Sequence, residues 1–141
     1  MKYFTINELC ASSTAKAKNI NNTPSESIKA HLKEFVENLL DPIREELGYP
    51  IIVNSGYRCL ALNKAVGGAP TSAHTIGYAS DIHCKAESLA KMYSRILNFL
   101  TRNNIPYDQL IYERSKTSVW IHIGYKNQKG LQRKQHFNLN V

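Results

Sequence analysis

Residues 72–81 read SAHTIGYASD, and residues 119–124 read VWIHIG. The first stretch holds His74 and Asp81, and the second holds His122 inside an apolar run. A catalytic zinc site takes three protein ligands from His, Asp, Glu or Cys and keeps a fourth position for water. Two imidazole nitrogens and one carboxylate oxygen suit Zn²⁺, which lowers the pKa of water from about 16 toward about 7. The three residues are therefore candidate ligands.

Spacing alone leaves a simpler interpretation open. A lone histidine in a strand is more often a hydrogen-bonded structural residue, and a histidine seven positions before an aspartate also arises by chance. A metal site requires that a loop carrying His74 and two strands carrying Asp81 and His122 meet at one point of a small sheet. Because successive side chains of a strand point to opposite faces, His122 should face away from Ile121 and Ile123.

Two sequences in the first part of the chain have the pattern of a helix start. The T-x-x-E sequence at 5–8 predicts a short helix that begins near Ile6, and T-P-S-E at 23–26 predicts a longer helix capped by Thr23. The polar stretch 11–22 between them is expected to be a surface loop.

The longer helix has one apolar stripe. Its apolar residues recur at intervals of three and four, at Ile28, Leu32, Phe35, Leu39 and Ile43. Pro42 should kink or divide the helix because it lacks an amide donor, and Gly48 is expected to end it.

The rest of the chain alternates between short strand-like segments and one helix. Strands are expected at 51–53, 78–84, 107–113 and 118–125, and a helix is expected at 87–103. The last two strands should form a hairpin, and the weakly alternating tail can add an edge strand. These elements predict a single domain over residues 1–141 of the α+β class, with a small, mainly antiparallel sheet packed against helices.

Composition excludes several classes of protein. A content of 43% hydrophobic and 21% charged residues excludes wholesale disorder, and three cysteines without a CxxC pair make a disulfide framework unexpected. No stretch approaches about 18 apolar residues, and MKYFTINELC lacks the apolar core of a signal peptide. We therefore expect a protein made in the cytoplasm without a signal peptide and without a membrane partner. The net charge of +7 favours an anionic partner but names none.

Five linked motifs follow one another along the chain. They are S-G-Y-R at 55–58, L-N-x-x-V-G-G at 62–68, S-x-H-x-x-G-x-A-x-D at 72–81, D-Q-L-I-x-E at 108–113 and W-x-H at 120–122. In this order they resemble the motifs of the M15 zinc D-alanyl-D-alanine carboxypeptidases, and the similarity runs from about residue 3 to about residue 125. The resemblance implies zinc ligation by His74, Asp81 and His122 and a fold shared with the zinc-binding domain of hedgehog proteins. It also implies hydrolysis of a peptide bond next to D-alanine in peptidoglycan stem peptides.

Four further residues are candidates for the reaction. Arg58 can bind a terminal carboxylate or a developing oxyanion through two parallel hydrogen bonds, although a surface salt bridge is the alternative. Glu113 is the candidate general base, because no acidic residue lies between it and His122, whereas other branches of the superfamily place their glutamate closer to that histidine. Ser72 and Trp120 are candidates for substrate binding; a loop-ordering role for Ser72 and core packing for Trp120 are the alternatives.

Three functions remain in competition. The first is a monomeric zinc peptidase, acting as a carboxypeptidase or an endolysin-like endopeptidase on the bacterial cell wall during phage or prophage lysis. The second is a binding module that keeps the metal but has lost turnover, an alternative that retention of Arg58 and Glu113 disfavours. The third is nucleic-acid binding, which only the +7 charge suggests; no known recognition motif is present, so no nucleic-acid partner is expected.

Overall fold

A five-stranded sheet with the strand order β1-β2-β4-β3-β5 organises the computed structural model, which describes residues 1–141. The strands are β1 (Ile52–Ser55), β2 (Ala79–His83), β3 (Gln109–Arg114), β4 (Val119–Gly124) and β5 (Gln135–Asn140). All neighbouring strands are antiparallel except β5, which runs parallel to β3. The prediction of an α+β fold with a small, mainly antiparallel sheet is confirmed, and the tail does add an edge strand.

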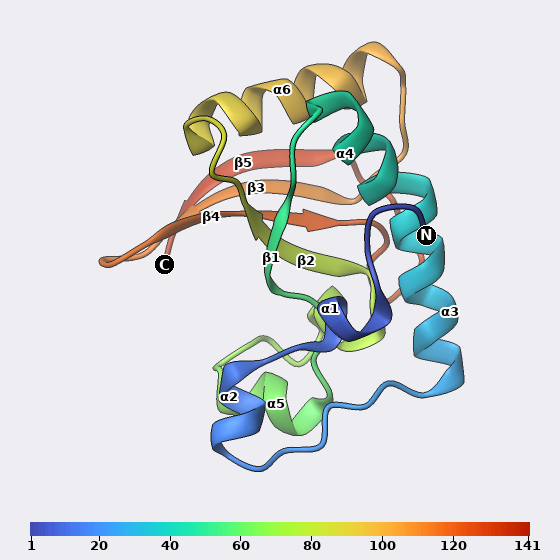
Figure 1. Ribbon diagram of the computed structural model, residues 1–141, viewed down its shortest axis with the longest axis vertical. Coiled ribbons are helices and arrows are strands. Elements are labelled where there is room, and N and C mark those ends of the chain that lie inside the picture. The colour runs from blue at the N-terminus through green and yellow to red at the C-terminus, as the bar shows by residue number, and fades with distance from the viewer.

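Helices occupy two regions around this sheet (Figure 1). The longer helices α3 (Glu26–Phe35), α4 (Asp41–Leu47) and α6 (Leu89–Arg102) carry the apolar stripes that face the core. The short helices α2 (Ser13–Ala17) and α5 (Leu60–Ala65) lie toward the end of the molecule opposite α6, and α1 (Ile6–Cys10) lies between them and the sheet. The predicted capping box of α1 is confirmed, since the Thr5 hydroxyl accepts a hydrogen bond from the Glu8 amide.

Two predictions about the N-terminal region are wrong. The polar stretch 11–22 is not a loop throughout, because Ser12 accepts a hydrogen bond from the Ala15 amide and starts α2. The cap of α3 is Ser25, not Thr23: the Ser25 hydroxyl accepts from the Ile28 amide. A polar stretch rich in small residues offers several capping hydroxyls, and the neighbouring sequence does not say which one the helix uses.

Pro42 divides the first long helix as predicted. A π-helical turn, η1 (Val36–Leu40), precedes it and runs into α4 without leaving right-handed helical backbone, and this widened turn accommodates the ring and the missing amide donor of Pro42. Gly48 ends α4 in a left-handed conformation with φ of 74°, as expected of a C-terminal glycine.

The core fills one face of the sheet. It is a cluster of 21 buried residues that includes Ile82, Leu110, Ile121 and Ile123 from the strands and the apolar stripes of α3, α4 and α6. Side chains alternate along a strand, so the neighbours of these four residues in each strand face the other side of the sheet. The helical core does not cover that side. No helix combines the length and the apolar character needed to cross a membrane.

Candidate metal centre

Asp81 and His122 are brought together by the pairing of two neighbouring strands. Asp81 on β2 stands directly opposite His122 on β4, and Ile121 and Ile123 on either side of His122 are fully buried in the core. Directly paired residues project to the same face, so both polar side chains lie on the face away from the core. The predicted orientation of His122 is confirmed.

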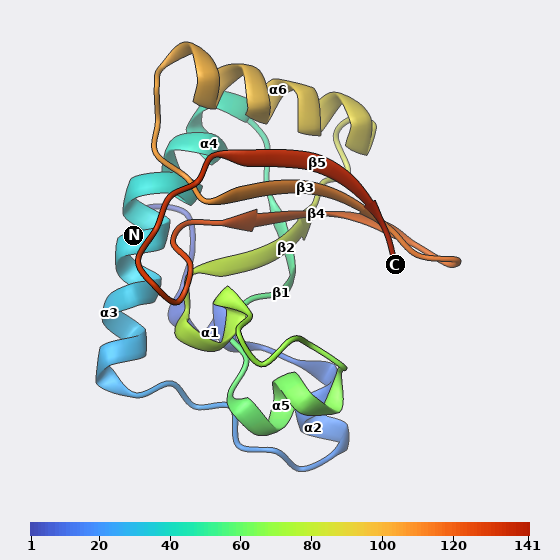
Figure 2. The same cartoon turned by 180° about the vertical axis from the view of Figure 1, so that it is seen from behind.

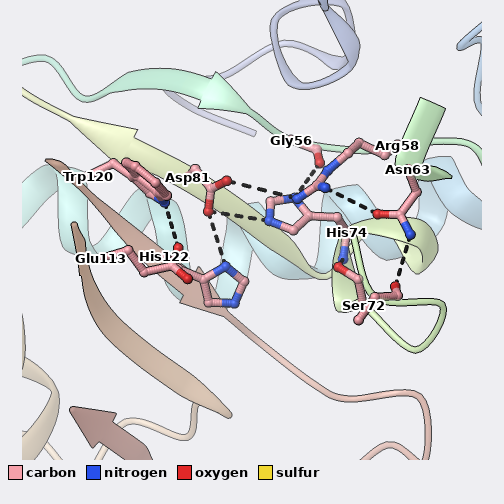
Figure 3. Close-up of polar contacts among 10 residues, drawn as sticks. Gly56, Arg58, Asn63, Ser72, His74, Asp81, Glu113, Trp120 and His122 are labelled. Carbon is pink, nitrogen blue, oxygen red and sulfur yellow. Dashed lines mark hydrogen bonds and ion pairs between the residues drawn. The ribbon is translucent and has the colours of Figure 1, made fainter. Parts of the chain in front are cut away.

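His74 reaches the same point from a short 3₁₀ helix, η2 (Ala73–Ile76). The Ser72 hydroxyl accepts a hydrogen bond from the His74 amide and caps this helix. Gly77 ends it in a left-handed conformation with φ of 81°, which lets the chain turn directly into β2 and Asp81. Figure 3 shows the imidazoles of His74 and His122 on two sides of the Asp81 carboxylate.

The distances between the candidate ligand atoms fit one ion. Asp81 Oδ1 lies 3.4 Å from His74 Nε2 and 3.1 Å from His122 Nδ1. One ligand atom from each residue lies within 4.8 Å of the others. Ligands about 2.0–2.1 Å from a tetrahedral zinc are about 3.3–3.4 Å apart, so the two distances to Asp81 are close to those of a zinc site.

The hydrogen bonding of His74 also favours a cation at this point. Its Nδ1 lies 2.7 Å from the Gly56 carbonyl oxygen, which can only accept, so Nδ1 carries the proton and Nε2 keeps a free lone pair. Nε2 is buried without a hydrogen-bond partner, and it faces a carboxylate oxygen. Two acceptors that face each other at 3.4 Å repel unless a cation lies between them, as a metal ion would.

The protonation of the cluster suits metal binding. Burial lowers the pKa of His74, which favours the neutral imidazole that a metal requires. For Asp81, burial acts to raise the pKa, but its contacts with His74 and His122 outweigh burial and hold the pKa below its usual range. The aspartate is therefore an ionised ligand at neutral pH.

Arg58 lies beside this cluster with part of its guanidinium unused. Its Nη2 is 3.9 Å from Asp81 Oδ2, and its Nη1 donates to Asn63 Oδ1 at 3.1 Å. Its Nε is buried and has no acceptor. Burial lowers the pKa of Arg58 from its ordinary value, and the charges of Asp81 and Glu113 partly offset this effect, so the side chain stays cationic.

Glu113 and Trp120 form a pair on the β3–β4 hairpin. They stand opposite each other, and the Trp120 indole Nε1 donates a hydrogen bond of 2.5 Å to Glu113 Oε2. Figure 3 shows this pair next to Asp81 and His122. The indole thus holds one carboxylate oxygen and leaves the other free.

Two hollows meet at the metal cluster. One, of about 490 Å³, is lined by Trp120 and by parts of α2 and α5; the other, of about 330 Å³, is lined by His74, His122 and Ser72. Arg58, Asp81 and Glu113 line both hollows, so the cluster stands where the two halves of one cleft join. All seven predicted site residues border this cleft; the roles of Ser72 and Trp120 in substrate binding stay predictions.

Three supporting residues were not assigned a role from the sequence. Gly56 supplies the carbonyl that fixes the His74 ring, and Asn63, only 3% exposed, holds Arg58 while its amide donates to the Ala69 carbonyl. A Cβ on Gly68 would lie 2.1 Å from Asn63 Oδ1, so only glycine leaves room for this side chain. All three stand inside the S-G-Y-R and L-N-x-x-V-G-G motifs, which is the signal that pointed to them.

Comparison with protein families gives a match over residues 2–124 to the family described as Peptidase M15. Comparison with curated proteins finds no match. The family match includes all three candidate ligands, Arg58 and the Glu113–Trp120 pair, whereas β5 lies beyond it. Since the match spans most of the chain, the protein belongs to the peptidase M15 family, whose members are metal-dependent peptidases.

Proposed function

We propose that this protein is a zinc-dependent peptidoglycan peptidase. Its reaction is the hydrolysis of a peptide bond next to D-alanine in stem peptides, as a D,D-carboxypeptidase or as an endolysin-type endopeptidase. The observation that carries the proposal is the convergence of His74 Nε2, Asp81 Oδ1 and His122 Nδ1 at the centre of a cleft. Membership of the M15 family supports a peptidase, and the resemblance in the five motifs supports the D-alanine substrate.

Two nitrogens and one carboxylate oxygen are a ligand set that suits zinc and leaves one position for a further ligand. A zinc ion held there supplies an activated water and a Lewis acid that polarises the scissile carbonyl. The chain's own contribution is to fix the ligands before the metal arrives. The Gly56 carbonyl sets the tautomer of His74, and strand pairing sets Asp81 opposite His122.

Glu113 is the proposed general base. Its Oε2 is occupied by the indole of Trp120, so Oε1 is free to accept a proton from the attacking water and to pass it to the leaving amine. The hydrogen bond to Trp120 also restricts the rotation of the carboxylate. A base held in one orientation has less conformational freedom to lose as the reaction proceeds.

Arg58 is the proposed anion-binding residue. Its cationic side chain is only 12% exposed, and Asn63 and Asp81 hold the two terminal nitrogens. A guanidinium in a partly buried position strengthens hydrogen bonds to a substrate carboxylate or to the oxyanion that forms during attack. Because Arg58 lines both hollows, a substrate that occupies either of them lies next to this side chain.

The partner that we propose is the peptidoglycan stem peptide, bound by a monomer, with no nucleic acid or membrane as partner. Action at the bacterial cell wall, in phage or prophage lysis, is part of the same proposal. The net charge of +7 would draw the protein toward an anionic wall polymer.

The decisive experiment is digestion of purified peptidoglycan, with the released ends identified by mass spectrometry. We expect cleavage next to D-alanine that a chelator abolishes and zinc restores. Glu113→Gln should abolish turnover but keep bound zinc, whereas His122→Ala should lose zinc, both measured by metal analysis of the purified protein. Zinc retention without any hydrolysis by the wild-type protein would instead support the binding module, and wild-type activity in Glu113→Gln would refute the proposed base.

A further inference from the structure

The C-terminal strand β5 presents its apolar side chains to the open face of the sheet. Phe137, Leu139 and Val141, which we call the tail stripe, are 41%, 39% and 63% exposed. The residues between them, Asn138 and Asn140, are polar. A strand that served only the core would have the reverse pattern, with its apolar side chains buried.

The register of the strands places the tail stripe on the same face as the metal cluster. Phe137 pairs with Ile111, which pairs with His122, and Leu139 pairs with Glu113. Directly paired residues share a face, so the stripe continues a surface that already holds His122 and the candidate base. Ile111 is only 5% exposed but is not part of the core cluster, so this surface has an apolar floor of its own.

One end of the tail stripe, Val141, reaches the cleft. Val141 lines the 490 Å³ hollow together with Arg58, Glu113 and Trp120. Figures 1 and 2 show the C-terminus ending on the side of the sheet where α2 and α5 lie. Val141 therefore borders the half of the cleft that Trp120, α2 and α5 line.

β5 is held firmly enough to act as a wall. The Asp108 carboxylate, only 2% exposed, accepts hydrogen bonds of 2.8 Å from both Nε and Nη2 of Arg133, just before the strand. The Val141 amide donates to the Arg114 carbonyl at 2.8 Å, which fixes the far end. The backbone of a strand fixed at both ends loses little further freedom when a ligand binds.

We propose that the tail stripe is a subsite for an aliphatic part of the peptide substrate, about three residues from the bond that is cut. Phe137 lies two strand spacings from His122, about 10 Å, and an extended peptide advances about 3.3 Å per residue. The substrate is therefore a peptide that extends past the metal cluster on the Glu113 side. Cleavage of this peptide rests on the proposed function, whereas binding of the peptide to the tail stripe does not.

Peptides that differ at one position test this subsite. The probes are blocked synthetic peptides built around a central D-alanyl-D-alanine bond, with leucine or asparagine three residues away on either side. Binding is followed in zinc-loaded Glu113→Gln protein by the fluorescence of Trp120, the only tryptophan. We expect leucine on one side to bind about tenfold more tightly than asparagine, the effect of burying part of one aliphatic side chain.

Variants of β5 then test whether the tail stripe causes the preference for leucine. The double substitution Phe137→Thr and Leu139→Thr keeps the propensity of a strand but removes the apolar surface, and it should abolish the preference for leucine. Asn138→Thr changes the opposite face of the same strand and should leave the preference intact. Circular dichroism of each variant establishes that it is folded before binding is compared.

Several results would overturn the subsite. They are equal binding of both peptides by the wild-type stripe, no saturable binding at all, or an equal loss of the preference in Asn138→Thr. Light scattering could also show that the wild-type protein is a dimer and that, of the two β5 variants, only the double variant is a monomer. That result would make the tail stripe an interface between two copies of the chain. Binding with the expected preference but no release of ends from purified peptidoglycan by zinc-loaded wild-type protein would refute the proposed function alone, and cleavage without the preference would refute the subsite alone.

Discussion

Gly56 joins the N-terminal helix to the metal centre, and an alanine in its place should damage both stability and metal binding. A Cβ added to Gly56 would lie 2.1 Å from the Leu9 carbonyl oxygen and 3.0 Å from the Leu9 carbonyl carbon. That same carbonyl accepts a hydrogen bond from the Tyr57 amide at 2.8 Å. Because the clash is with backbone, no side chain can move aside to relieve it.

The magnitude follows from the movement that this clash requires. The two segments must separate by about 1 Å to reach an ordinary contact, an overpacking that costs about 1–3 kcal/mol, and a weakened Tyr57–Leu9 hydrogen bond costs about 1 kcal/mol more. At about 3 °C per kcal/mol for a chain of this length, Tm should fall by about 6–12 °C. The same movement displaces the Gly56 carbonyl that holds His74, so zinc affinity should fall about 10–100-fold.

The assay compares Gly56→Ala with Gly130→Ala in thermal unfolding and in competition for zinc with a chromogenic chelator. Gly130 has φ of 77° but open space around it, so alanine there should cost about 1 kcal/mol through backbone strain alone and leave zinc affinity unchanged. Wild-type stability of Gly56→Ala would refute the close approach. A loss of stability with normal zinc affinity would refute the coupling between the Gly56 carbonyl and the metal centre.

Three further predictions concern Trp120, Cys10 and the removal of zinc. Trp120→Phe keeps the ring but removes the donor to Glu113, so kcat should fall about tenfold with zinc content unchanged, and an unchanged kcat would contradict the orienting role. Burial raises the pKa of the Cys10 thiol from 9.0 to about 11, so mass spectrometry should find it largely unmodified by iodoacetamide at pH 8; rapid modification would contradict its burial. Because the folded pKa lies above the unfolded one, the contribution of this thiol to folding stability is complete below about pH 8.5 and is lost as the pH rises toward 11. Removal of zinc from the holoprotein should lower Tm, and the loss should be absent in His122→Ala, since binding to the folded state alone stabilises it by mass action.

The sequence predicted the faces of the strands better than the details of the turns. Alternation around His122 was sufficient to predict which side of the sheet it faces, because burial of Ile121 and Ile123 leaves no other choice. The pairing of Asp81 with His122 could not be derived from spacing, since it depends on β2 and β4 being neighbours in a sheet formed by distant segments. Only the linked motifs made that pairing an expectation.

Most contacts within the site could not be predicted from the sequence. Nothing local indicates that Asn63 would hold Arg58 or that Trp120 would hold Glu113, because both contacts depend on side-chain geometry set by the tertiary structure. The wrong cap at Thr23 has a local cause, since Ser25 is an equally good capping residue two positions later. The parallel direction of β5 follows from the chain crossing from β4 to the far side of β3, which a weakly alternating tail does not reveal.

The pairing of Asp81 with His122 also has a kinetic consequence. These candidate ligands are 41 residues apart in the chain, and α6 and β3 lie between them. The metal centre therefore forms only after this long segment has brought β2 and β4 together, at a cost in chain entropy. We expect bonds to zinc to form after the transition state for folding, so zinc should leave the refolding rate almost unchanged and slow unfolding. The metal would then lengthen the lifetime of the native protein without changing the order in which the chain folds.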